Sequence, residues 1–134
     1  MDIVTREERA RMMAAVPQRH SKPEIVVRKI AHSLGYRYRL HVKDLPGSPD
    51  LVFPRLRKVI FVHGCFWHRH TCKKTTSPTT NRRFWLKKFE ENKKRDRRNI
   101  RELRKAGWEV LVVWECWTLR REWLTEKLET FLKE

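Results

Sequence analysis

The sequence lacks the features that mark several classes of protein. No apolar run approaches the roughly 20 residues that a membrane-spanning helix needs, and residues 1–16 have no signal-peptide pattern. The 134 residues contain no internal repeat and no interdomain linker, and they are too few for two comfortable domains. The 3 cysteines are an odd number, which argues against a disulfide framework and favours metal or catalytic use. We therefore expect one cytoplasmic domain.

Acidic residues are scarce relative to basic ones. The chain has 16 Asp and Glu against 32 Lys and Arg, which gives a net charge of +16 and a pI near 10.5. Such an excess indicates a polyanionic partner, of which nucleic acid is the commonest; a membrane surface and the ribosome are the alternatives. A hydrophobic content of 40% with 6 tryptophans argues against a disordered basic tail.

Capping signals and hydrophobic periodicity predict an α/β sandwich built on a small mixed sheet. Two capping-box patterns, at residues 5–8 and 21–24, each open a helix, and the first helix ends before Pro17. The elements expected after it are a helix over 22–34, strands over 36–42, 50–53 and 58–62, a helix over 82–105, a strand over 108–114 and a helix from about Leu119. The core order is thus α-β-β-β-α-β with a closing helix.

Two of these elements have faces that the sequence assigns. Over residues 36–42, apolar Tyr36, Tyr38, Leu40 and Val42 alternate with Arg37, Arg39 and His41, which predicts a half-buried strand. The inward stripe of the long helix is expected to be Phe89, Asn92, Asp96, Ile100 and Leu103. A carboxylate on that stripe needs a partner, either an arginine, a histidine or a bound cation.

Every cysteine of the chain fits one metal site. Cys65, His70 and Cys72 lie in one loop, and Cys116 follows the strand that ends at Trp114. Together they form a Cys3His set, a standard tetrahedral arrangement for structural zinc. The alternative is that Cys116 is an ordinary core cysteine and that the loop binds nothing.

Two carboxylates stand where an element begins. Glu24 opens the helix after Ser21, although a capping box alone accounts for a glutamate at that position. Asp50 opens a strand after Pro49, and a turn residue is the alternative there. Taken singly, neither residue distinguishes a catalytic site from local structure.

Aromatic rings and basic residues occur together in two places. Phe66 and Trp67 lie beside the expected zinc ligands, either as core residues or as apolar wedges that enter a base step. The helix over 82–105 carries Lys and Arg around most of its surface, interleaved with Trp85. This pattern suits a surface that follows a nucleic-acid backbone, and a solvated charged face is the alternative.

The stretches "GSPDLVF…KVIFVHGCFWHRHTC" and "FWLKKFEENKKRDRRNIRELRKAGWEVLVVWEC" resemble the very-short-patch-repair (Vsr) DNA mismatch endonucleases. The resemblance runs from about Thr5 to Cys116, and the HGCFWHxHxC block is highly specific. It implies a restriction-endonuclease-like fold with a zinc loop. It also implies nicking of double-stranded DNA on the 5′ side of the T in a T:G mismatch left by deamination of 5-methylcytosine, with a 3′-hydroxyl and a 5′-phosphate as products.

The resemblance also implies roles for individual residues. Catalysis would fall to Asp50, His68, Glu24, His63 and Asp96, with His68 acting on the attacking water and Glu24 supporting it. Asp50 and the backbone carbonyl of Val62 would hold one or two Mg²⁺. The ligands of a structural Zn²⁺ would be Cys65, His70, Cys72 and Cys116. The DNA-intercalating side chains would be Phe66, Trp67 and Trp85.

Two positions depart from the family pattern. Val62 replaces a threonine, and related nucleases carry a second acidic metal ligand there, so only its carbonyl could bind Mg²⁺. Arg69 replaces a histidine, and we expect it to add a phosphate contact and to leave zinc binding intact. We expect residues 1–20 to form a DNA-contacting helical arm and residues 21–134 to form a single nuclease domain. We expect the protein to be a monomer in the bacterial cytoplasm, associated with the nucleoid. A functional link to a cytosine-5 methyltransferase and to mismatch-repair proteins is also expected.

Two rival functions remain open at this point. One is a zinc-histidine nuclease in which His63 and His68 act without Asp50. The other is a zinc-stapled module that binds mismatched or bent DNA without cutting it.

Overall fold

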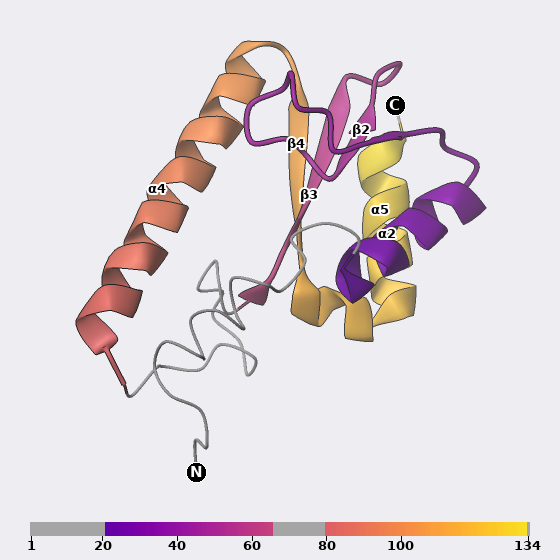
Figure 1. The fold of residues 1–134 in the computed structure, drawn as a ribbon. Helices are drawn as coiled ribbons and strands as arrows, with labels where there is room; N and C mark the ends of the chain where they lie inside the picture. The colour runs from indigo at the N-terminus through magenta and orange to yellow at the C-terminus, as the bar shows by residue number, and fades with distance from the viewer. Residues whose placement is uncertain (1–20, 66–79, 134) are drawn as a thin grey trace.

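The computed structural model describes residues 21–65 and 80–133 and shows three layers (Figure 1). The helix α2 (Lys22–Ser33) and the closing helix α5 (Arg121–Leu132) cover one face of a sheet, and the long helix α4 (Arg82–Lys105) covers the other. The N-terminal arm expected over residues 1–20 lies outside the described residues. Within the described part of the chain, no helix has the length and apolar character to cross a membrane.

The sheet is mixed, as the sequence predicts. Its strands are β1 (Arg39–Leu40), β2 (Leu51–Phe53), β3 (Lys58–His63) and β4 (Glu109–Trp114), in the spatial order β1-β2-β3-β4. The first three strands pair antiparallel, and β4 pairs parallel to β3 after the crossover through α4. The predicted α-β-β-β-α-β order with a closing helix is therefore confirmed.

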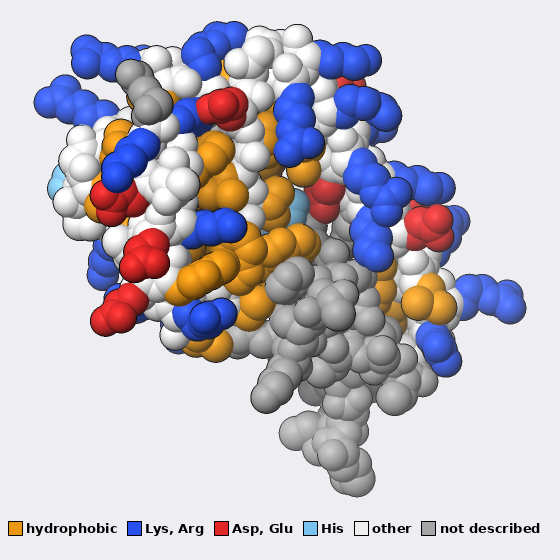
Figure 2. Space-filling view, turned by 180° about the vertical axis from the view of Figure 1, so that it is seen from behind, with side chains coloured by type: hydrophobic (Ala, Val, Ile, Leu, Met, Phe, Trp, Pro, Cys, Tyr) orange, Lys and Arg blue, Asp and Glu red, His pale blue; other side chains and the backbone are white. Residues whose placement is uncertain are grey.

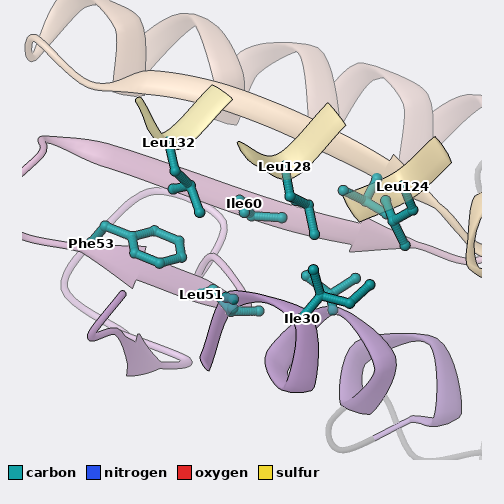
Figure 3. Close-up of a cluster of buried hydrophobic side chains, with 10 residues drawn as sticks. Ile30, Leu51, Phe53, Ile60, Leu124, Leu128 and Leu132 are labelled. Carbon is teal, nitrogen blue, oxygen red and sulfur yellow. The ribbon is translucent and has the colours of Figure 1, made fainter. Parts of the chain in front are cut away.

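Side-chain alternation divides the core into two clusters, one on each face of the sheet. On the face covered by α2 and α5, the leucines of α5 point toward Ile60 of the sheet and Ile30 of α2 (Figure 3). The buried residues of this cluster are Val27, Ile30, Ala31, Leu51, Phe53, Ile60, Val113, Leu124, Leu128 and Leu132. Because β2 and β3 alternate, Val52, Val59 and Phe61 face the opposite side and pack with Leu103 of α4.

The inward stripe of α4 is confirmed. Phe89, Asn92 and Leu103 are buried, and Asp96 and Ile100 on the same stripe are half-buried. The lysines and arginines of this helix are all exposed. In Figure 2, which views the molecule from behind, Lys and Arg side chains gather along the side where α4 runs.

The strand predicted over 36–42 is shorter than expected, and its polar face is partly wrong. Only Arg39 and Leu40 form strand, and both are exposed. His41 has a φ of 48°, in the left-handed region, so the extended backbone ends there. The prediction that His41 shares the polar face of Arg37 and Arg39 therefore fails, because side chains alternate between two faces only while the backbone stays extended. Its side chain turns inward.

The closing helix begins two residues later than predicted, at Arg121. A short 3₁₀ helix, η1 (Glu115–Leu119), precedes it and was not expected from the sequence. The Thr118 hydroxyl donates to the Glu115 carbonyl at 2.7 Å within this turn. The other predicted helices and strands that fall within the described residues agree with the structure to within about one residue at their ends.

Candidate active site

Asp50 lies at the point where β2 and β3 separate. The last paired residues at this end of the two strands are Leu51 and Ile60. Beyond them the Val62 backbone N–H donates to Oδ2 of Asp50 at 2.7 Å. Asp50 therefore satisfies a backbone donor of the neighbouring strand, and this contact across the sheet is more than a turn residue requires.

Glu24 approaches the same point from the first turn of α2. Its backbone N–H donates to the Ser21 hydroxyl at 3.4 Å, so the helix cap predicted from the sequence is present. Its carboxylate, only 1% exposed, forms an ion pair with Arg28 and a 2.9 Å hydrogen bond with Nε2 of His41. Helix capping alone therefore does not explain this glutamate.

His41 is a member of the site that the sequence analysis did not identify. Its Nε2 lies 2.9 Å from Oε1 of Glu24 and 3.7 Å from Oδ1 of Asp50. Its backbone N–H also donates to the Asp50 carbonyl at 3.3 Å. A signal did exist: once 36–42 and 50–53 are paired as neighbouring antiparallel strands with Leu40 opposite Leu51, His41 comes opposite Asp50.

The environment shifts the two carboxyl pKa values in opposite directions. Burial raises the pKa of Asp50 to about 7; the Val62 N–H opposes this shift and the charge of Glu24 adds to it. Burial also acts to raise the pKa of Glu24, but the hydrogen bonds and positive charges of His41 and Arg28 outweigh it and lower that pKa. At neutral pH Glu24 is thus ionised, whereas Asp50 is poised between its two forms.

The three side chains can hold a cation. One ligand atom from each of Glu24, His41 and Asp50 lies within 4.8 Å of the other two. Two carboxylates with a raised pKa on one of them form the arrangement that a divalent ion stabilises, because its charge removes their repulsion. Carboxylate oxygens suit Mg²⁺, while the imidazole nitrogen would also suit Mn²⁺ or another transition ion.

Two of the expected zinc ligands follow neighbouring strands. His63 ends β3 and Trp114 ends β4, and these two residues are paired in the parallel register. Cys65 and Cys116 each come two residues after their strand, at the same edge of the sheet. The Cys65 backbone N–H donates to Oε1 of Glu115, at the start of η1, at 3.3 Å. The other two expected ligands, His70 and Cys72, lie outside the described residues.

His63 and Asp96 belong to the layer between the sheet and α4. His63 is buried and follows Phe61 in the alternation of β3; its ring contacts Phe61 and Trp114. Asp96 lies one helical turn from buried Asn92 on the inward stripe of α4. The two residues approach the sheet from the face opposite to α2, which carries Glu24.

Trp85 is the one expected intercalating residue within the described residues. Its side chain is 6% exposed, and its ring stacks on Phe89 with a centroid separation of 6.1 Å. The neighbouring Phe84 is 48% exposed and meets Trp85 edge-on. In this conformation Trp85 belongs to the core under α4. The other expected intercalating rings, Phe66 and Trp67, and the expected catalytic His68 lie outside the described residues.

Comparison with known proteins identifies the family of this chain. The family model described as DNA mismatch endonuclease Vsr matches residues 1–74. The type II nicking enzyme V.XorIIP of Xanthomonas oryzae pv. oryzae is 48% identical over 115 residues, covering 86% of this chain and 85% of that protein. The chain belongs to the Vsr family.

Two further relatives extend the match. The type II nicking enzyme V.NmeAIP of Neisseria meningitidis serogroup A is 40% identical over 133 residues, 99% of this chain and 95% of that protein. The DNA mismatch endonuclease Vsr of Escherichia coli K12 is 40% identical over 129 residues, 96% of this chain and 83% of that protein. The predicted Vsr resemblance is confirmed, and it supports a DNA endonuclease with the mixed sheet described above.

Proposed function

We propose that this chain is a Mg²⁺-dependent endonuclease that nicks duplex DNA 5′ to the T of a T:G mismatch and leaves a 3′-hydroxyl and a 5′-phosphate. The observation that carries the proposal is the cluster of buried Glu24 with half-buried His41 and Asp50 where β2 and β3 separate, in a member of the Vsr family. The exposed basic residues of α4 support duplex DNA as the substrate, because they can neutralise backbone phosphates.

The backbone of β3 supports the Mg²⁺ assignment. In an extended strand, the N–H and C=O of one residue point to the same side. Because the Val62 N–H donates to Asp50, the Val62 carbonyl is expected on that side of β3 as well. Asp50 and this carbonyl would then provide hard oxygen ligands for Mg²⁺, as the sequence analysis expects.

The chemistry needs an activated water and a stabilised leaving group. Bound Mg²⁺ would neutralise charge on the scissile phosphate and on the departing 3′-oxygen. His68 would accept the proton of the attacking water, and Glu24, held ionised by Arg28 and His41, would support it. His63 and Asp96 would act from the α4 side, on the phosphate and its water network.

Recognition would depend on the loop between β3 and α4. A T:G wobble costs less to unstack than a correct pair, so insertion of Phe66 and Trp67 would favour mismatched DNA. Zinc held by Cys65, His70, Cys72 and Cys116 would fix the backbone that carries these rings. Trp85 would join them after leaving its stacking contact with Phe89.

The test is nicking of end-labelled duplexes, one with a central T:G in a CC(A/T)GG-like context and one fully paired. We expect a nick 5′ to the mispaired T that requires Mg²⁺ and is absent in Asp50→Asn. A matched control is Asp44→Asn, because Asp44 is exposed on the loop before the site. Enzymatic ligation of the nick reports the 3′-hydroxyl and 5′-phosphate ends.

The same assay separates the rival functions. If the protein is a zinc-histidine nuclease, its Asp50→Asn variant would still cut DNA. A binding module would retain the mismatched duplex and cut neither substrate with any divalent ion. Either result would overturn the proposal.

A further inference from the structure

His41 has contacts to both carboxylates of the proposed active site, and neither the expected zinc site nor the expected magnesium ligands include it. Its Nε2 hydrogen-bonds Glu24 at 2.9 Å and lies 3.7 Å from the nearer oxygen of Asp50. The His41 side chain is only 9% exposed. The hydrogen bond between the ring and Glu24 is therefore shielded from bulk water.

The backbone at His41 is shaped to bring the ring inward. A φ of 48° is uncommon for a residue that has a side chain. His41 directly follows Leu40, the last residue of β1. The backbone N–H of His41 donates to the Asp50 carbonyl at 3.3 Å, so the turn is tied to the aspartate itself. A backbone departure of this kind, held by its surroundings, is typical of functional sites.

The contacts of Glu24 show what the ring does. One carboxylate oxygen pairs with Arg28 from the next turn of α2, and the other accepts a hydrogen bond from His41. Arg28 belongs to the same helix as Glu24, whereas His41 comes from the turn next to β2. The His41 hydrogen bond thus ties the Glu24 carboxylate to the turn next to the strand that begins after Asp50.

We propose that His41 is a positioning residue of the nicking reaction: its Nε2–H orients the Glu24 carboxylate beside Asp50. This inference rests on the proposed endonuclease function. Its physical basis is that a carboxylate that loses this donor can rotate out of position, and a displacement of about 1 Å in a catalytic group can lower a rate roughly 100-fold.

Two substitutions separate the hydrogen bond from the shape of the ring. His41→Gln keeps a side-chain N–H donor, whereas His41→Leu keeps bulk without a donor. His32→Leu is the matched control, because His32 is an exposed histidine on α2 with no described contact to the site. Single-turnover nicking of a T:G duplex is measured as a function of Mg²⁺, beside DNA binding without divalent ions and urea unfolding of each full-length variant.

For His41→Leu we expect a fall of about 100-fold in the single-turnover rate at saturating DNA, with DNA affinity unchanged within about twofold. His41→Gln should recover to within about tenfold of the unsubstituted protein. His32→Leu should nick at the normal rate. If His41→Leu unfolds, the comparison of His41→Gln with the unsubstituted protein still tests whether an amide donor suffices.

Three outcomes would overturn the inference. The first is a His41→Leu rate within threefold of normal. The second is a His41→Gln variant that folds but is as slow as His41→Leu. The third is a selective loss of Mn²⁺-supported over Mg²⁺-supported nicking in both variants, which would make His41 a metal ligand instead. If the unsubstituted protein nicks no DNA, the proposed function itself fails. If the unsubstituted protein nicks DNA and its Asp50→Asn variant does not, the three outcomes above test only the role of His41.

Discussion

Replacing Asp50 with asparagine should stabilise the metal-free protein while abolishing its activity. Burial raises the pKa of Asp50 from 3.8 to about 7, so the folded state resists ionisation of this carboxyl more than the unfolded state does. Stability from the neutral form is fully present below pH 3.8 and is lost as the pH rises toward 7. An asparagine never ionises, and its amide oxygen can still accept the Val62 N–H.

The size of the effect follows from the two pKa values. At about 1.36 kcal/mol per pKa unit, the ionised carboxyl costs the folded state about 4 kcal/mol at pH 8. At pH 5 the same cost is about 1.5 kcal/mol, because the folded carboxyl is then mostly protonated. The advantage of Asp50→Asn should therefore be larger at pH 8 than at pH 5 by roughly 2–3 kcal/mol.

Urea unfolding in metal-depleted buffer at pH 5 and pH 8 measures this difference. Comparing the variant with the unsubstituted protein at each pH removes contributions that the substitution does not alter. Asp44→Asn, at an exposed position on the same loop, should show no such dependence. Equal effects of Asp50→Asn at the two pH values, or a larger advantage at pH 5, would refute the argument that burial opposes the Asp50 charge.

Three further predictions follow from the site and the fold. Below the Asp50 pKa of about 7, Mg²⁺ must displace a proton from this carboxyl, so the apparent Mg²⁺ affinity of the DNA-free protein should rise from pH 6 to pH 7 and level off by pH 8. Calorimetry in buffers of different ionisation enthalpy measures the released proton. An affinity that does not change with pH would contradict this assignment. The purified protein should contain one zinc ion per chain by elemental analysis, and Cys116→Ser should lose it along with several degrees of thermal stability, whereas a zinc-free yet fully stable protein would exclude the zinc site. Gly47→Ala should destabilise the protein more than Gly35→Ala. Both glycines have positive φ, which costs an alanine roughly 1–2 kcal/mol, but only at Gly47 would the new Cβ meet Asn99, at 2.9 Å from its Nδ2. Equal losses of stability in urea unfolding would show that the Asn99 side chain moves aside freely.

Much of the fold could be predicted because its signals are local. The stripe of α4 repeats every three or four residues, and the short apolar runs of β2 and β3 are typical of strands buried on both faces. Ser21 caps the start of α2, and Gly35 and Gly107 follow the C-terminal ends of α2 and α4 with positive φ. The basic surface of α4 could be predicted from the excess of Lys and Arg in its sequence. The family could be predicted from the sequence motif alone.

The site itself is less local, since Glu24, His41 and Asp50 come from a helix, a turn and the start of a strand. Taken singly, Glu24 and Asp50 had plausible local roles in the sequence, and their catalytic roles were implied only by the family resemblance. The strand pattern assigned His41 to the wrong face, because alternation assumes an extended backbone and cannot show a left-handed residue.

The sequence by itself thus determined the order of the elements, the inward faces of most of them, the basic surface and the family. Only the tertiary structure decided that Asp50 accepts the Val62 N–H where β2 and β3 separate, and that α2 brings Glu24 to the same point. The physical reason is that a carboxyl pKa depends on burial and on neighbouring charges distant in the sequence, which the folded chain alone brings together.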